Sequence, residues 1–411
     1  MHPPHGDGSR QNTYDEVVQF GRDRSPGGRW LPRVALACLV LAAIIAVIVR
    51  GASHDSGHAT ETSHPAPAIR VITVGRSLLG VTAAWELFAR GSDDLLRIQL
   101  AQGKISVTYV PQLQSATPDV AFVIGPHEAV IRSSDLVPGY VVPDGGQARQ
   151  LTGPLAGSGP LVPGPAGSQA AWVWVTAGLP TSPRLALVTL TGHPSGRTIR
   201  FAPGGPQLPV SAVSDGRGDV LVETASFSIY DAGPGWDRLV PGSVVAVGPT
   251  TWLVVSCNPL YRHCRDDVVD IADGTRRVLP GPAAGYPYDF FSWPPIGVIT
   301  PDGSTAAVAE TASGQPTTGE VKSDGGIAAV AGSARDSVLT VHLINLKTGA
   351  NRNLGIPLGA DFSDESMVWS PDGRWLFVAA ADGKLVAVDA RTGKAAILPR
   401  LPAVTEVAIR P

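Results

Sequence analysis

The sequence predicts an all-β fold built from repeated units and preceded by one membrane-spanning helix. Three observations predict this arrangement. Its 47 glycines and 37 prolines recur throughout the chain, which is typical of short strands joined by turns. After residue 67, apolar residues alternate in short runs bounded by Gly, Pro and Asp, the pattern of β-strands. Near the N-terminus, one uncharged apolar run predicts the membrane segment.

Four regions follow from these patterns. We expect a largely disordered cytoplasmic tail at residues 1–33, a transmembrane signal-anchor helix at residues 34–50, a flexible linker at residues 51–66 and the repeat domain at residues 67–411. The linker mixes Ser, Thr, Gly and three histidines without apolar periodicity. Such a solvated segment rarely forms a specific metal site, so we expect no metal there.

The apolar run VALACLVLAAIIAVIV at residues 34–49 contains no charge, Gly or Pro. As a helix it would span about 24 Å, and Arg33 and Arg50 could extend their guanidinium groups to the two interfaces. Basic residues concentrate before the run, where the chain has Arg22, Arg24, Arg29 and Arg33. The positive-inside rule therefore places the N-terminus in the cytoplasm and the domain outside.

A cleaved signal peptide is the alternative to a retained anchor. The residues directly after the apolar run are Ile48, Val49 and Arg50, which do not form a small-x-small cleavage site. A retained single-pass anchor in the cytoplasmic membrane is therefore favoured. The formal net charge is -3 and charged residues make up 16% of the chain, so no basic surplus exists to neutralise phosphates, and we expect no nucleic-acid partner.

Tryptophans mark the repeats of the domain. Four tryptophans each introduce or open an apolar run, at spacings of 87, 80 and 123 residues: Trp85, Trp172, Trp252 and Trp375. The first two spacings are two periods of about 40 to 44 residues, close to one blade of a β-propeller. The third becomes similar once a polar insertion around residues 311–336 is removed.

Glycine turns give the number of repeats. A tight turn needs a residue at positive φ, which Gly adopts without steric cost. Seven such turns are expected, at Gln102-Gly103, Asp144-Gly145, Thr191-Gly192, Gly233-Pro234-Gly235, Asp273-Gly274, Thr348-Gly349 and Thr392-Gly393. Further tight turns are expected at Ser214-Asp215-Gly216, Pro301-Asp302-Gly303 and Pro371-Asp372-Gly373. The sequence therefore predicts a seven-bladed β-propeller, with six or eight blades as alternatives.

The final unit, MVWSPDGRWLFVAAADGKLVAVDARTGKAAILP, resembles the WD40-like, TolB-type and quinoprotein-type repeats of bacterial β-propellers. The resemblance implies four-stranded antiparallel blades around an axis. It also implies closure by pairing of the last strand, near Thr405–Ile409, with the first blade. Quinone-cofactor enzymes share the turn at Asp389–Lys394, but that turn is structural in the family, and we expect no cofactor.

Motifs for catalysis are absent from the sequence: it has no G-x-S-x-G, H-E-x-x-H, C-x-x-C or P-loop pattern. Scattered groups could still supply acids or bases, and we interpret them as turn or edge-strand residues: Asp266, Asp267, Asp270, His127, His193, His263 and His342. A non-catalytic protein- or ligand-binding domain, acting as scaffold or sensor on a cell-envelope protein or small ligand, is therefore favoured. The alternatives are a hydrolase or lyase with a loop-built site at the channel mouth, and a structural envelope scaffold.

Two cysteines are expected to form a disulfide. Cys257 ends one apolar run and Cys264 begins the next, across a six-residue loop, in a compartment that permits oxidation. A metal site formed by Cys257, His263 and Cys264 is the alternative, but it lacks a fourth ligand nearby.

An aromatic segment predicts the binding surface. Five aromatic residues fall within eight positions, namely Tyr286, Tyr288, Phe290, Phe291 and Trp293, and aromatic side chains often anchor interfaces. In antiparallel blades, this segment, the cysteine-flanked loop and the polar insertion all emerge on one face, at the fifth and sixth blades. The alternative is that the rings pack inward as core.

Overall fold

The computed structural model describes residues 69–110, 121–132, 139–152, 161–164, 169–175, 184–200, 209–215, 218, 220–224, 228–231, 238–257, 264–281, 297–311, 339–359 and 364–411. All of them belong to one compact unit, Pro65–Pro411. In this part of the chain the secondary structure is β-strand with two short 3-10 turns, η1 (Leu100–Gln102) and η3 (Asp364–Ser366). The predicted all-β class is confirmed.

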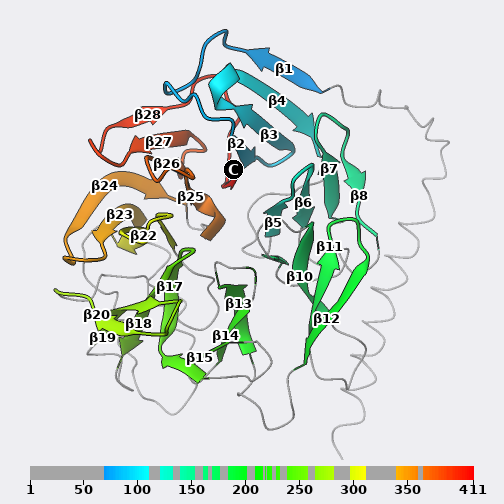
Figure 1. The fold of residues 1–411 in the computed structure, drawn as a ribbon. Helices are drawn as coiled ribbons and strands as arrows, with labels where there is room; N and C mark the ends of the chain where they lie inside the picture. Colours follow the sequence, from blue (N-terminus) through cyan, green and yellow to red (C-terminus); the bar gives the residue numbers. More distant parts are fainter. Residues whose placement is uncertain are drawn as a thin grey trace, which may run out of the picture. The chain divides into compact units, whose positions relative to one another are not determined.

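The first and last parts of the domain share a five-stranded sheet (Figure 1). Its strands, in spatial order, are β1 (Arg70–Thr73), β4 (Lys104–Tyr109), β3 (Asp94–Gln99), β2 (Glu86–Arg90) and β29 (Glu406–Arg410). The C-terminal strand β29 pairs antiparallel with β2 along its whole length. Closure by the last strand, which the resemblance to propeller repeats implied, is confirmed, with the strand one residue later than expected.

Four further sheets are four-stranded antiparallel meanders in chain order. The first contains β5 (Ala121–Ile124), β6 (Glu128–Arg132), β7 (Tyr140–Pro143) and β8 (Arg149–Gln150); the second contains β9 (Leu161–Pro163), β10 (Ala170–Val175), β11 (Arg184–Thr189) and β12 (Pro194–Arg200). The third contains β13 (Pro209–Ser214), β14 (Val220–Thr224), β15 (Ser228–Asp231) and β16 (Arg238–Pro241); the fourth contains β25 (Met367–Trp369), β26 (Trp375–Ala379), β27 (Leu385–Asp389) and β28 (Ala395–Ile397).

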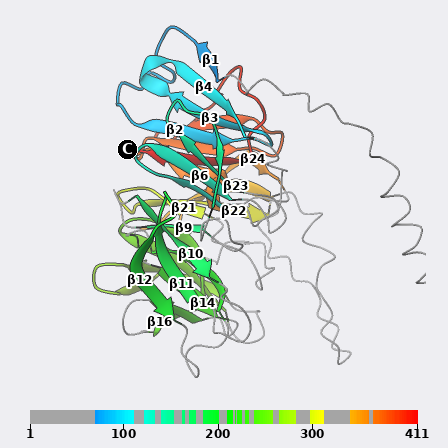
Figure 2. The same ribbon diagram turned by 90° about the vertical axis from the view of Figure 1, so that its right-hand side faces the viewer.

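The remaining sheet has eight strands, and β22 and β23 run side by side in it (Figure 2). Two antiparallel meanders are joined through a parallel pair, β17 with β21. One meander contains β17 (Ser243–Val247), β18 (Thr251–Cys257), β19 (Cys264–Asp270) and β20 (Arg276–Val278); the other contains β21 (Gly297–Ile299), β22 (Thr305–Thr311), β23 (Leu339–Asn345) and β24 (Asn351–Leu358).

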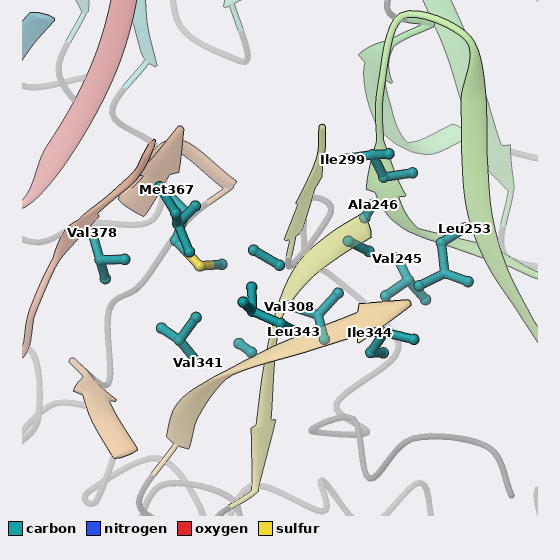
Figure 3. Packing of buried hydrophobic residues seen from close by; sticks show 14 of the residues in the cluster. Val245, Ala246, Leu253, Ile299, Val308, Val341, Leu343, Ile344, Met367 and Val378 are labelled. Atoms are coloured by element: carbon teal, nitrogen blue, oxygen red, sulfur yellow. The ribbon is translucent and has the colours of Figure 1, made fainter. Parts of the chain in front are cut away.

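Neighbouring sheets touch in chain order, and the last touches the first. Strand β29 contacts β5, β5 contacts β9, β9 contacts β13, β15 contacts β17, β21 contacts β25, and β25 contacts β29. Meanders that follow one another in this closed order form a β-propeller. The apolar faces between the sheets supply the core, as seen where Val245 and Leu253 of one meander, Val308 and Leu343 of the next, and Met367 of the following sheet belong to one buried cluster (Figure 3).

The predicted glycine turns are confirmed wherever the structure describes them. The described members all have positive φ and connect the third and fourth strands of a sheet: Gly103, Gly145, Gly192, Gly274, Gly349 and Gly393. The turn at residues 233–235, and Gly216 of the turn predicted at Ser214-Asp215-Gly216, lie outside the described residues. Gly303 and Gly373, in the turns between first and second strands, also have positive φ.

Candidate functional site

Three segments that the sequence singled out attach to one end of the eight-stranded sheet. Because β17 and β21 are parallel and all other neighbours in this sheet are antiparallel, β18, β20 and β22 run in the same direction. The cysteine-flanked loop follows β18, the aromatic segment follows β20, and the insertion follows β22. We call the end at which Cys257, Cys264, Thr311 and Leu339 lie the loop-bearing end.

The three segments themselves lie outside the described residues, at 258–263, 282–296 and 312–338. The predicted binding residues Tyr286, Tyr288, Phe290, Phe291 and Trp293 therefore stay a prediction, as does His263. The strands that carry them are described. The tight turns at Gly274, Gly303 and Gly349 lie at the opposite end of this sheet.

Cys257 and Cys264 are directly opposite each other at this end, as the last pair of the β18–β19 ladder. The amide of Ile271 donates to the Thr250 carbonyl at the other end of the ladder, so residues 250 and 271 form a hydrogen-bonded pair. Antiparallel ladders alternate, which makes Cys257 and Cys264, seven residues further along, a non-hydrogen-bonded pair. Such pairs have Cα atoms about 4.5 Å apart, within the range for a disulfide.

Buried polar side chains gather beneath the loop-bearing end. Five of the buried polar residues among those described lie in the strand segments next to it: Asp266, Asp267, Glu310, Thr340 and His342. Our interpretation of Asp266, Asp267 and His342 as turn or edge-strand residues is wrong, because these side chains are buried within β19 and β23. It holds for His127 and His193, which are exposed in turns or next to them, whereas Asp270 is exposed at the end of the interior strand β19.

A hydrogen-bonded network joins β22, β23 and β24. Asn351 Nδ2 donates to Glu310 Oε1 at 2.8 Å, which leaves Asn351 Oδ1 to accept from His342 Nδ1 at 2.9 Å. Glu310 Oε2 lies 3.4 Å from the same nitrogen. In the neutral imidazole, Nε2 is then an acceptor for the Thr340 hydroxyl, 3.1 Å away. Asn353 Nδ2 donates to Thr340 Oγ1 at 3.2 Å.

This network has the hydroxyl–imidazole–carboxylate order found in nucleophilic catalysis. Its burial argues for another role, since Thr340 is 7% exposed and His342 is 6% exposed, which leaves a substrate little access. Each member of the network, from Asn353 to Glu310, makes at least one of these hydrogen bonds. Hydrogen-bond networks rigidify the strands that carry them, so this network favours a structural role in holding β22, β23 and β24 together.

A second polar group lies on β19. Asp267, which has no exposed side-chain surface, accepts through Oδ2 from Arg276 and from Arg265, the latter at 3.3 Å. Arg276 Nη2 also donates to Ser256 Oγ at 2.7 Å. The guanidinium therefore ties β20 to β18 and β19 next to the cysteine pair. No group of three or more His, Cys, Asp or Glu side chains suited to a metal occurs in the described part of the chain.

The predicted membrane segment at residues 34–50 lies outside the described residues. Within the ranges that are described, no helix is long and apolar enough to cross a membrane.

Comparisons with known proteins give little beyond this geometry. No family model matches the chain, and no curated protein matches it. Among solved structures, hydrazine synthase of Kuenenia stuttgartiensis is 14% identical over 67% of this chain and 78% of that chain, with a TM-score of 0.41. Hsv2 of Kluyvelomyces marxianus is 8% identical over 67% of this chain and 73% of that chain, with a TM-score of 0.36. At these TM-scores neither likeness bears on function.

Proposed function

We propose that the protein is a membrane-anchored, extracytoplasmic β-propeller of seven blades that acts as a non-catalytic scaffold or sensor. The blade count is supported by the parallel β17–β21 pair, which divides the eight-stranded sheet into two meanders. With the four other meanders and the sheet closed by β29, the described residues contain seven units of at least four strands.

The observation that carries the binding role is the common origin of the three segments. The cysteine-flanked loop, the aromatic segment and the insertion all leave the loop-bearing end of one sheet. The strands there are held by the Glu310–His342–Asn351 network and by Arg276. Variable loops on a rigid scaffold are where proteins usually place recognition. A cell-envelope protein or a small ligand would bind there through the aromatic side chains.

Alanine substitution of Tyr288, Phe291 and Trp293 together tests this role in the full-length protein. Loss of partner capture from the native membranes with unchanged thermal melting is the expected result. Tyr109→Ala serves as the control, because Tyr109 is an aromatic residue that is 42% exposed on a different sheet. A loss of several kcal/mol of stability, as core aromatic truncations give, would show instead that the rings are core and would refute the binding surface.

The anchor and topology are tested separately. Protease added to intact spheroplasts should digest the domain after Arg50 and spare an epitope at residue 5. Survival of the whole chain would contradict an external domain.

We also propose a disulfide between Cys257 and Cys264. The support is their position as a non-hydrogen-bonded pair at the end of the β18–β19 ladder. The bridge would close the loop at residues 258–263. Mass spectrometry of protein isolated without reductant should find the two cysteines linked, and two free thiols would refute the bridge.

A further inference from the structure

The eight-stranded sheet contains a junction between two meanders that is formed by strand pairing. Each meander has an inner strand at one edge, and the inner strands β17 and β21 pair in parallel, with Ala246 opposite Gly297 and Val247 opposite Val298. Among the described residues, no other two neighbouring meanders are joined in this way. Backbone pairing therefore runs without interruption from β20 to β24.

Two glycines allow these inner strands to approach each other. A Cβ at Gly248, just past β17, would lie 2.7 Å from the Cβ of Ile299 in the other meander. A Cβ at Gly297 would lie 2.4 Å from the Ala307 carbonyl oxygen. Neither glycine has a positive φ, so both positions require the absence of a side chain rather than a special backbone conformation. A larger residue at Gly248 would push β17 and β21 apart.

The next junction, between β21 and β25, has bulkier residues at the equivalent positions. Gly248 and Thr300 are equivalent, because the amide of each closes the turn that follows its inner strand. Gly297 and Met367 are equivalent, because each begins an inner strand that ends in such a turn. With Thr300 and Met367 in place of the two glycines, β21 and β25 touch without pairing.

The two paired meanders are also tied away from their inner edges. Arg277 of β20 donates through Nη2 to the carbonyl of Leu346, just after β23, at 2.6 Å. Buried side chains of both meanders belong to one apolar cluster, but that cluster also includes side chains of the sheet β25–β28. Since apolar packing extends across both junctions, strand pairing is what distinguishes the β17–β21 junction.

We propose that the eight-stranded sheet is one cooperative unit within the domain, which opens and closes as a single body. Units that open locally in proteins often coincide with hydrogen-bonded supersecondary motifs, and here two such motifs share one continuous sheet. The consequence for recognition rests on the proposed binding role. The cysteine-flanked loop, the aromatic segment and the insertion would start from strand ends with a fixed spacing, so a partner would meet them as one surface.

Hydrogen exchange of the full-length protein, followed by mass spectrometry, tests this unit with the variant Val254→Ala. Val254 of β18 is fully buried in the cluster that contains Leu221 of β14, so its truncation creates a cavity away from β22 and β23. We expect the amides of β18 and β19 to exchange roughly ten- to a hundredfold faster, and those of β22 and β23 by the same factor. The amides of β26 and β27 should exchange as in wild type.

Two results of this experiment would overturn the proposal. Unchanged exchange in β22 and β23 would show that the two meanders open independently. Equal acceleration in β26 and β27 would show that the domain opens only as a whole. Neither result depends on capture of a partner, so failure of the cooperative unit is distinguishable from failure of the binding role.

A second variant, Gly248→Thr, gives the β17–β21 junction the residue found at the next junction. In this background, Val254→Ala should still accelerate exchange in β18 and β19 but should no longer affect β22 and β23. Thr300→Ser is the matched control, because it keeps a hydroxyl at the β21–β25 junction and should leave the joint response unchanged. A joint response that persists with Gly248→Thr would refute coupling through strand pairing.

Discussion

Charged side chains at the start of β2 form a cluster that joins two sheets. Arg410 contacts both Glu86 and Asp144, with Nη2 2.7 Å from Asp144 Oδ2, and donates through Nη1 to the Pro126 carbonyl at 2.8 Å. Its guanidinium lies 4.9 Å over the Phe88 ring. Burial raises the pKa of Glu86, but hydrogen bonds from Arg97, Arg410 and Gln99 outweigh burial and hold this pKa below its usual value.

Because this pKa is lowered in the folded protein, the loss of stability caused by Glu86→Gln should depend on pH. A carboxyl group whose pKa is lower in the folded state stabilises that state above the unfolded pKa, about 4.3. The stabilisation is lost as pH falls through the lower folded pKa. We expect Glu86→Gln to cost about 1.5–3 kcal/mol at pH 7 and progressively less below about pH 4. Urea unfolding of both proteins across this pH range measures the difference, and a cost that stays constant with pH would contradict it.

Equivalent glycine turns in adjacent meanders differ in how closely the rest of the chain approaches them. Gly274 and Gly349 occupy the same turn in adjacent meanders, with φ of 70° and 73°. A Cβ at Gly274 would meet nothing within 4 Å, whereas one at Gly349 would lie 1.8 Å from the Pro280 carbonyl oxygen. Tryptophans of two different sheets bind the connection between β13 and β14. Trp172 Nε1 donates to the Gly218 carbonyl, and Trp252 Nε1 donates to the Asp215 carbonyl.

The two glycines give a matched pair of substitutions. Gly274→Ala should cost about 1–2 kcal/mol, the penalty of a left-handed Ala. Gly349→Ala should cost about 1–3 kcal/mol more, because the Pro280 carbonyl must also move. Chemical denaturation of the two variants beside wild type checks this. Equal losses would mean that Pro280 adjusts freely and that the close approach is unimportant.

Closure of the whole domain depends on charge pairs at both ends of β29. The strands β2 and β29 have the same pattern, ELFAR and EVAIR, so their antiparallel pairing sets Glu86 opposite Arg410 and Arg90 opposite Glu406. Arg90 is 1% exposed, and its Nη2 donates to Glu406 Oε1 at 2.7 Å. A slip of the register would break both pairs, so the charges specify how the ends of the domain meet.

Removing one partner of the buried Arg90–Glu406 ion pair should destabilise the protein far more than replacing both partners with apolar residues. Glu406→Gln leaves the buried Arg90 charge without its counter-ion, and we expect a loss of about 3–5 kcal/mol. The double variant Arg90→Met/Glu406→Leu removes both charges and should recover most of that loss. Thermal and urea unfolding of the three proteins measures this. A double variant as unstable as Glu406→Gln would show that the ion pair itself, rather than compensation of a buried charge, closes the domain.

Turn chemistry and strand alternation were sufficient, from the sequence alone, to predict the all-β class and the described glycine turns, whereas closure by the last strand was implied only by the resemblance of the final unit to propeller repeats. These features depend on neighbours close in sequence, because a tight turn requires a positive φ and a buried face requires alternation. Only the tertiary structure decided that Asp267 and His342 are buried and that Arg410 meets both Glu86 and Asp144. Those outcomes depend on which side chains face each other across strands and sheets, and residues as far apart as 86 and 410 carry no local signal of their contact.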